Sequence, residues 1–400
     1  MLPAVGIYIH IPFCHHRCTY CDFNIYAGMR SLYERYARAA AAEIASAPPG
    51  LAAATIYFGG GTPSLLPVEH LALILDAIRR AFDVAPDAEI TLEANPRPRD
   101  DGYFRRLRAL GINRLSLGMQ SAIERDLHLF RRGHTFDDLA RTYRLARAAG
   151  FDNLNLDLIY GIPGQSLDDW RATLDAALAL EPEHLSAYSL QVEDGTTLKK
   201  WIAQGKVSPP NDDLAADMYI LAEDVLEAAG FLHYEISNWA RVPPVSSLQP
   251  PASSLQLPTS NLQPLVSRHN LIYWRDEPYL GFGCGAHSWL GGRRFSNVRH
   301  PRAYIEAIEA GQGVEAESEL IAREMEMGET MMLGLRLLEE GVTFARFAAR
   351  FGVGMRDIYD RPMKKLSKMN LIEIDADRVR LSRQGRLIGN RVFGAFLHDA

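Results

Sequence analysis

The chain of 400 residues is long enough to form one large domain and a smaller one. Its hydrophobic fraction of 47% and charged fraction of 23% are those of an ordinary globular protein. The net charge of −6 argues against a dedicated nucleic-acid-binding protein, which is usually basic. No apolar run is long enough to cross a bilayer and no basic signal-peptide region opens the chain, so we expect a cytoplasmic protein. The four cysteines, of which three are clustered, exclude a disulfide framework.

Strand-like and helix-like segments alternate through the first part of the chain. The expected strands are 6–11, 54–59, 89–93, 113–118, 153–160 and 184–190. The expected helices are 30–47, 67–83, 100–110, 136–149, 167–180 and 212–229. Alternation of this kind predicts parallel βαβ units with helices on the outside. Six such units are too few for a closed eightfold barrel, so the pattern predicts an α/β fold built on an open, partial (β/α)6 barrel.

The composition then changes, and it divides the chain into four predicted parts. These are a core at 1–240, a low-complexity, disordered insertion at 241–267, a connecting segment at 268–320 and a C-terminal domain at 321–400. The C-terminal part has helices followed by a small hairpin, which resembles a winged helix. Its lysines and arginines fit a solvated face better than a phosphate-binding one, because the whole chain is acidic.

The chemistry of the chain centres on three cysteines of one loop. Cys14, Cys18 and Cys21 follow the first expected strand at C-x3-C-x2-C spacing. Close thiols on a loop most often hold a soft metal centre. Three thiolates on a four-iron cluster would leave one iron open to a small molecule. The alternative is a structural zinc site whose fourth ligand is His10, His15 or His16.

Glycine-rich or polar segments follow each expected strand, at the end that carries the chemistry in barrel folds. These segments contain the run Gly59-Gly60-Gly61-Thr62 and the side chains of Glu93, Gln120, Asp157 and Ser189. A zinc site on one loop would not need the other strand ends, so their convergence predicts one composite pocket. Taken singly, the glycine triplet is also compatible with a tight turn, each acid with a helix cap or an ion pair, and Gln120 with a satisfied loop amide.

Together these segments resemble the radical S-adenosylmethionine (SAM) superfamily. Within it, the runs 8–14, 59–64, 93–96, 114–121 and 157–165 are similar to the oxygen-independent coproporphyrinogen III oxidase group. True oxidases of that group carry a further cysteine where this chain has Phe23, and an extension before the first strand, which here begins almost at Met1. Both departures indicate the HemW-like, haem-chaperone branch of the group.

The resemblance implies roles for the matching residues. Cys14, Cys18 and Cys21 would ligate a [4Fe–4S] cluster whose open iron binds the amine and carboxylate of SAM. The residues that would line the SAM site are Tyr8, Gly60, Gly61, Thr62, Glu93, Gln120, Arg132, Asp157 and Ser189. His269 opens a segment that resembles the H-N-x-x-Y-W segment associated with haem in the chaperone branch; on its own, a lone histidine beside aromatic residues indicates a core position. Cys284 is expected to be a packed core residue.

Three functions remain open at this point. The first is a haem chaperone that binds a [4Fe–4S] cluster, SAM and haem as cargo, and delivers haem to a respiratory acceptor protein. The second is a coproporphyrinogen III dehydrogenase that decarboxylates propionate side chains with a SAM-derived radical. The third is a zinc-stabilised nucleic-acid-binding protein. For the first we expect haem or porphyrinogen, an electron donor for the cluster and the haem acceptor as partners, with no stable nucleic acid and at most peripheral membrane contact.

Overall fold

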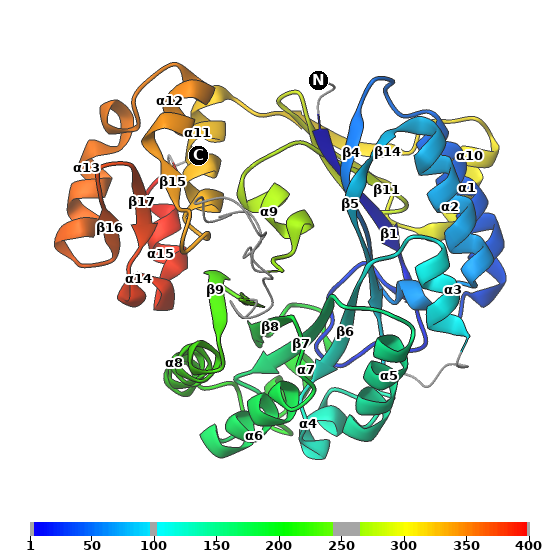
Figure 1. Ribbon diagram of the computed structural model, residues 1–400, viewed down its shortest axis with the longest axis horizontal. Helices are drawn as coiled ribbons and strands as arrows, with labels where there is room; N and C mark the ends of the chain where they lie inside the picture. The colour runs from blue at the N-terminus through cyan, green and yellow to red at the C-terminus, as the bar shows by residue number, and fades with distance from the viewer. Residues whose placement is uncertain (1–3, 97–101, 243–264, 398–400) are drawn as a thin grey trace, which may run out of the picture.

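A computed structural model describes residues 4–96, 102–242 and 265–397 of the chain. Its centre is a twelve-stranded sheet in the order β14-β13-β12-β11-β1-β4-β5-β6-β7-β8-β10-β9. Neighbouring strands from β11 through β8 run parallel. The sheet curves into an open barrel with helices on its outer face, and the C-terminal domain lies beside β9 (Figure 1).

The elements have the following bounds. The strands of the large sheet are β1 (Ala4–Ile11), β4 (Ala52–Gly60), β5 (Asp83–Ala94), β6 (Arg114–Gln120), β7 (Leu154–Tyr160), β8 (His184–Ser189), β9 (Phe231–Glu235), β10 (Asn238–Arg241), β11 (Tyr279–Phe282), β12 (His287–Leu290), β13 (Arg293–Asn297) and β14 (Glu315–Leu320). The helices around it are α1 (Tyr33–Ala45), α2 (Val68–Ala81), α3 (Tyr103–Ala109), α4 (Glu124–Leu129), α5 (Phe136–Ala148), α6 (Leu167–Leu178), α7 (Thr197–Ala203), α8 (Asp212–Ala228), α9 (Arg268–Trp274) and α10 (Pro301–Glu309). The short strands β2 (Phe13–Cys14) and β3 (Tyr26–Ala27) pair with each other, and the short 3-10 helices are η1 (Arg30–Leu32) and η2 (Pro63–Leu65).

The predicted alternation of strands and helices is confirmed, and so is the partial barrel. Strands β6 and β7 are buried almost throughout, as parallel strands covered on both faces must be. The helices begin where the sequence offers caps. The Thr135 hydroxyl accepts a hydrogen bond from the backbone N–H of Asp138, and the Asp138 carboxylate accepts one from the backbone N–H of Thr135. Ser166 and Asp169 are paired in the same way. These capping boxes fix the starts of α5 and α6.

The chain after the insertion completes the barrel in a way that the sequence did not predict. Strand β11 returns to the edge of the sheet and pairs in parallel with β1, Tyr8 facing Gly281 in the register. The connecting segment therefore contributes a seventh parallel strand. Strands β12, β13 and β14 extend the same sheet in antiparallel order. The segment thus extends the sheet beyond the first strand.

The C-terminal domain has its own core and a small sheet. Its elements are α11 (Arg323–Gly334), β15 (Val342–Thr343), α12 (Phe344–Phe351), α13 (Met355–Lys368), β16 (Ile372–Ile374), β17 (Arg378–Leu381), α14 (Arg383–Leu387) and α15 (Gly389–Gly394). The three strands are ordered β15-β17-β16. This confirms the predicted helical, winged-helix-like unit. It contacts the barrel through Glu223 of α8, which forms ion pairs with Arg383 and Arg386.

Most of the predicted low-complexity insertion falls on 243–264, which lies outside the described residues. Among the residues that are described, none belongs to a helix long and apolar enough to cross a membrane.

Candidate functional site

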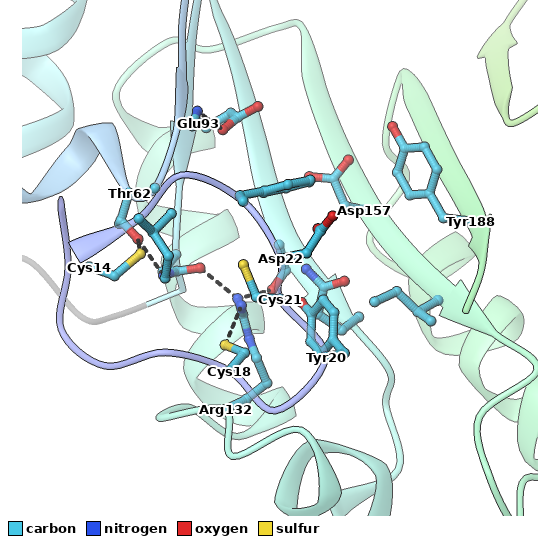
Figure 2. A pocket seen from close by; sticks show the side chains of 18 of the residues that line it. Cys14, Cys18, Tyr20, Cys21, Asp22, Thr62, Glu93, Arg132, Asp157 and Tyr188 are labelled. Atoms are coloured by element: carbon cyan, nitrogen blue, oxygen red, sulfur yellow. Dashed lines mark hydrogen bonds between the residues drawn. The ribbon is translucent and has the colours of Figure 1, made fainter. Parts of the chain in front are cut away.

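The three clustered cysteines face one cavity. The loop that carries them begins where β1 ends, and its backbone is tied down by the pairing of β2 with β3. Cys14, Cys18 and Cys21 are each partly exposed, and all three line a cavity of about 510 Å³. Figure 2 shows their sulfur atoms directed into the same space. The sequence prediction that the thiols work together is therefore geometrically possible.

The ends of the parallel strands supply the rest of the cavity wall. Of the predicted SAM-site residues, the structure brings together Gly60, Gly61, Thr62, Glu93, Gln120, Arg132, Asp157 and Ser189. They come from β4, β5, β6, β7 and β8, and Arg132 follows α4. Parallel strands put their carboxyl ends at one edge of a barrel, which is why residues so far apart in the sequence meet here.

The glycine triplet brings backbone close to the cysteine loop. Gly60 has φ of +110°, a conformation that residues with a side chain rarely adopt. A Cβ on Gly61 would lie only 2.6 Å from the carbonyl oxygen of Phe13. The N–H of Gly61 instead donates to Ile11, and the N–H of Thr62 donates to Phe13, at 2.8 Å each. The triplet is therefore more than a tight turn, because it locks β4 onto the loop that carries the cysteines.

Arg132 places a cation beside the cysteines. Its Nη1 lies 3.6 Å from Cys18 Sγ, and its Nη2 donates to Asn95 Oδ1 at 2.5 Å and to the carbonyl of Gly118 at 3.0 Å. Asn95 in turn donates to the hydroxyl of Thr62 at 2.8 Å. These contacts join the ends of β4, β5 and β6 to the cysteine loop (Figure 2).

Two carboxylates line the same cavity, and different hydrogen-bond donors act on the pKa of each. Burial raises the pKa of Glu93 to about 7, against the effect of a hydrogen bond from Tyr57. Burial also raises the pKa of Asp157, while hydrogen bonds from Ser116 at 2.7 Å and Asn155 at 2.8 Å act in the opposite direction. Neither acid caps a helix. Both are held by neighbouring strands, so the capping interpretation fails and a ligand-facing role remains.

Burial raises the pKa of the Cys14 thiol and raises that of Cys21 to about 11. Both groups are therefore protonated at neutral pH until a metal displaces the protons, as thiolate ligands require. In residues 4–96, 102–242 and 265–397, no three His, Cys, Asp or Glu side chains are grouped tightly enough to hold a single metal ion. His10, a possible zinc ligand, instead bonds the Tyr8 hydroxyl at 3.0 Å and the carbonyl of Asn24 at 2.9 Å.

Three other predicted residues lie away from the cysteines. Tyr8 lines a neighbouring cavity of about 480 Å³ that shares Gly60 and Glu93 with the first. Cys284 is fully buried and its backbone N–H donates to the Tyr36 hydroxyl at 2.9 Å, so it is the packed residue that the sequence predicted. His269 is 1% exposed, and both of its ring nitrogens are hydrogen-bonded inside the barrel.

The sequence did not single out Tyr57, Tyr20 or Ser116, which also line the cysteine cavity. Tyr57 had a usable signal, because side chains two apart in a strand share a face and Tyr57 stands two residues before Gly59. Tyr20 and Ser116 had none beyond their nearness to recognised motifs.

Comparisons with known proteins agree with this geometry. The family model described as "Radical SAM superfamily" matches residues 8–177, and the one described as "HemN C-terminal domain" matches 321–388. The chain is 36% identical to "Heme chaperone HemW" of Bacillus subtilis, with 98% of this chain and 99% of that protein covered. It is 38% identical to "Heme chaperone HemW" of Mycobacterium tuberculosis, with 98% and 94% covered. It belongs to the HemW branch of the radical SAM superfamily.

Solved structures show the same fold. The coproporphyrinogen III oxidase HemN of Escherichia coli, described as a radical SAM enzyme, superposes with a TM-score of 0.80, covering 99% of this chain and 90% of that one. The two sequences are 22% identical, so this likeness establishes the fold alone. Membership of the superfamily also identifies the cofactors: a [4Fe–4S] cluster and SAM.

Proposed function

We propose that this chain is a cytoplasmic haem chaperone that holds a [4Fe–4S] cluster and SAM, binds haem as cargo and hands it to an acceptor protein. The observation that carries the proposal is its full-length similarity to the Bacillus subtilis heme chaperone, 36% identity across 98% of this chain. The similarity includes the barrel and the C-terminal domain. By the resemblance to the branch, the acceptor is a respiratory protein and a separate electron donor reduces the cluster.

We assign the cluster to Cys14, Cys18 and Cys21. The assignment is supported by their common cavity and by Arg132, which balances thiolate charge beside Cys18. When bound, the cluster and SAM supply one-electron chemistry. The residues that we assign to SAM are Tyr8, Gly60, Gly61, Thr62, Glu93, Gln120, Arg132, Asp157 and Ser189; Tyr8 would reach it from the neighbouring cavity. Glu93 is the natural partner of the SAM ammonium, because its carboxylate is partly buried and lines the cavity.

We place the haem at the rim of the cysteine cavity. Phe23 and Tyr188 line that cavity and are 63% and 41% exposed. Exposed aromatic rings at the mouth of a cavity offer flat surfaces on which a porphyrin plane can stack. His269 as haem ligand stays a prediction that this conformation does not support, because an iron at Nε2 would have to replace the hydroxyl of Tyr273.

The test is an anaerobic assay of the reconstituted chain with coproporphyrinogen III, SAM and a reductant, together with haem titration followed by absorbance. We expect no protoporphyrinogen, saturable haem binding, and transfer of bound haem to apomyoglobin as a generic acceptor. Phe23→Ala and Tyr188→Ala should each weaken haem binding. Ile358→Ala, an exposed hydrophobic residue of the C-terminal domain, is the matched control.

Two outcomes would overturn the proposal. Decarboxylation of coproporphyrinogen over many turnovers would make the chain an oxidase, the second function that the sequence left open. If haem bound equally weakly to the wild type and to both rim variants, haem would not be the cargo of this protein.

A further inference from the structure

Helix α9 lies on the inner side of the curved sheet (Figure 1). Strands β4 and β5 pair Thr55 with Glu89 and, two residues on, Tyr57 with Thr91. Inward-facing side chains on such strands form successive layers along the barrel axis. Glu93, four residues after Glu89 on the same strand face, belongs to the cavity. The layer at Thr55 and Glu89 is therefore the one that α9 contacts, below the cavity floor.

The helix is fastened to this layer at its first turn. Glu89 is 5% exposed, and its two carboxylate oxygens accept the backbone N–H groups of Arg268 and His269 at 3.1 Å each. Gly6 of β1 leaves room for the helix, since a Cβ there would lie 2.8 Å from Ile272 and 3.3 Å from His269. The position of α9 in the barrel is thus fixed from two strands.

His269 connects the start of α9 to strand β4. Its Nδ1 lies 2.7 Å from the hydroxyl of Thr55, and its Nε2 lies 2.9 Å from the hydroxyl of Tyr273. With both nitrogens engaged, the ring is held in one orientation. It stacks on the ring of Tyr57, with 5.0 Å between centroids and 23° between planes.

Tyr57 in turn fixes the carboxylate of the cavity. Its hydroxyl donates to Glu93 Oε1 at 2.8 Å, while the backbone N–H of Gly60 donates to Glu93 Oε2 at 3.1 Å. On the side of Gly59 there is no spare volume, because a Cβ on that residue would lie 2.9 Å from Tyr57 and 3.2 Å from Glu93. A displaced Tyr57 ring would therefore move its hydroxyl away from the carboxylate.

We infer that His269 is a positioning residue of the SAM pocket: it braces Tyr57, and Tyr57 orients Glu93 toward the ligand ammonium. The inference rests on the proposed SAM site. It gives the segment that begins with His269 a role in cofactor binding that is separate from haem.

The electrostatics agree with this geometry. Burial lowers the pKa of His269 to about 3, so its ring is neutral and acts by packing and hydrogen bonding. Burial holds the pKa of Tyr57 well above its usual value, which keeps the hydroxyl available as a donor. The charged and titratable groups that face Glu93 are Tyr57, Asp157 and Arg114, with Tyr8, Cys14, Tyr188 and Tyr273 at longer range.

The experiment compares Tyr57→Phe, His269→Phe and His233→Phe in the full, anaerobically reconstituted chain. The control, His233, is also a buried histidine stacked on an aromatic ring, Trp239, but it contacts Glu223 near the C-terminal domain. SAM affinity is measured by equilibrium dialysis across pH, and iron content and melting temperature report on folding. We expect SAM binding to weaken about tenfold in Tyr57→Phe, the effect of one hydrogen bond to a charged group. We expect a loss of about threefold or more in His269→Phe and none in the control.

The pH profile separates positioning from general destabilisation. In the wild type, SAM binding should weaken as pH falls through about 7, because protonated Glu93 no longer attracts the ammonium. Tyr57→Phe removes a hydrogen bond that lowers this pKa, so the midpoint should move to higher pH. His269→Phe should move it in the same direction by less, whereas lost stability alone would lower iron content without moving the midpoint.

If His269→Phe kept the SAM affinity and the pH midpoint of the wild type while Tyr57→Phe changed both, the inference would be overturned. The proposed function would still stand. If the wild type bound no SAM, both would fail. Haem binding should be unaffected by His269→Phe, and its selective loss would instead make His269 a haem residue.

Discussion

The attachment of α9 to the barrel can be tested at Glu89 independently of any cofactor. Glu89 accepts hydrogen bonds from two backbone N–H groups, and both groups lie at the start of the helix. Glu89→Gln keeps the size of the side chain but replaces one acceptor oxygen with an NH2 group, which cannot accept a hydrogen bond. One of the two N–H groups is then left without a partner in a site where Glu89 itself is only 5% exposed.

The expected magnitude follows from that single loss. A hydrogen bond to a charged group contributes about 1.5–3 kcal/mol, so we take ~2 kcal/mol for the easier opening of α9. Since ~1.4 kcal/mol corresponds to a tenfold change in an equilibrium constant, backbone amides of α9 should exchange with solvent about 30-fold faster.

Asp87→Asn is the matched control, because it removes a contact to the same segment from the same strand. Asp87 pairs with the Arg268 guanidinium at 3.2 Å, but their side chains are 80% and 42% exposed. Exposed pairs contribute little, so exchange should change by less than about threefold. Hydrogen exchange of the peptide covering 268–274, followed by mass spectrometry, measures both variants. Equal acceleration in the two, or none in Glu89→Gln, would refute the reasoning.

Two further predictions concern the cysteines and the domain contact. Cys18→Ser should abolish iron loading on anaerobic reconstitution while Cys284→Ser leaves it nearly intact, because only Cys18 faces the cavity; equal losses would contradict the assignment. Burial raises the pKa of Glu223, but hydrogen bonds from His233 and Arg386 outweigh burial and lower it to about 2 from 4.5, so its stabilising effect is complete above pH 4.5 and is lost as the pH falls toward 2. Glu223→Gln should therefore lower the free energy of unfolding by about 2 kcal/mol at pH 7, allowing for partial solvent screening, and the gap to the wild type should shrink below about pH 5 in urea denaturation. A gap that stays constant down to pH 3 would count against this ion pair.

The sequence by itself determined the features that depend on near neighbours in the chain. The period of strand and helix segments and the caps at Thr135 and Ser166 are local, and they correctly predicted the parallel barrel. The cysteine spacing and the residues at the strand ends predicted the composite cavity for a related reason. In a parallel barrel every strand ends at the same edge, so order along the chain is enough to bring these residues together.

Only the tertiary structure decided where the chain goes after its insertion. The pairing of β11 with β1 joins segments about 270 residues apart, and no local pattern specifies that neighbour. The same holds for His269: its aromatic neighbours indicated a core position and the resemblance a haem ligand, but neither identified its partners. Its partners Thr55 and Tyr57 belong to a strand more than 200 residues earlier. Because Thr55 engages Nδ1 and the Tyr57 ring covers one face of the imidazole, the role of His269 is set by packing that the sequence does not display.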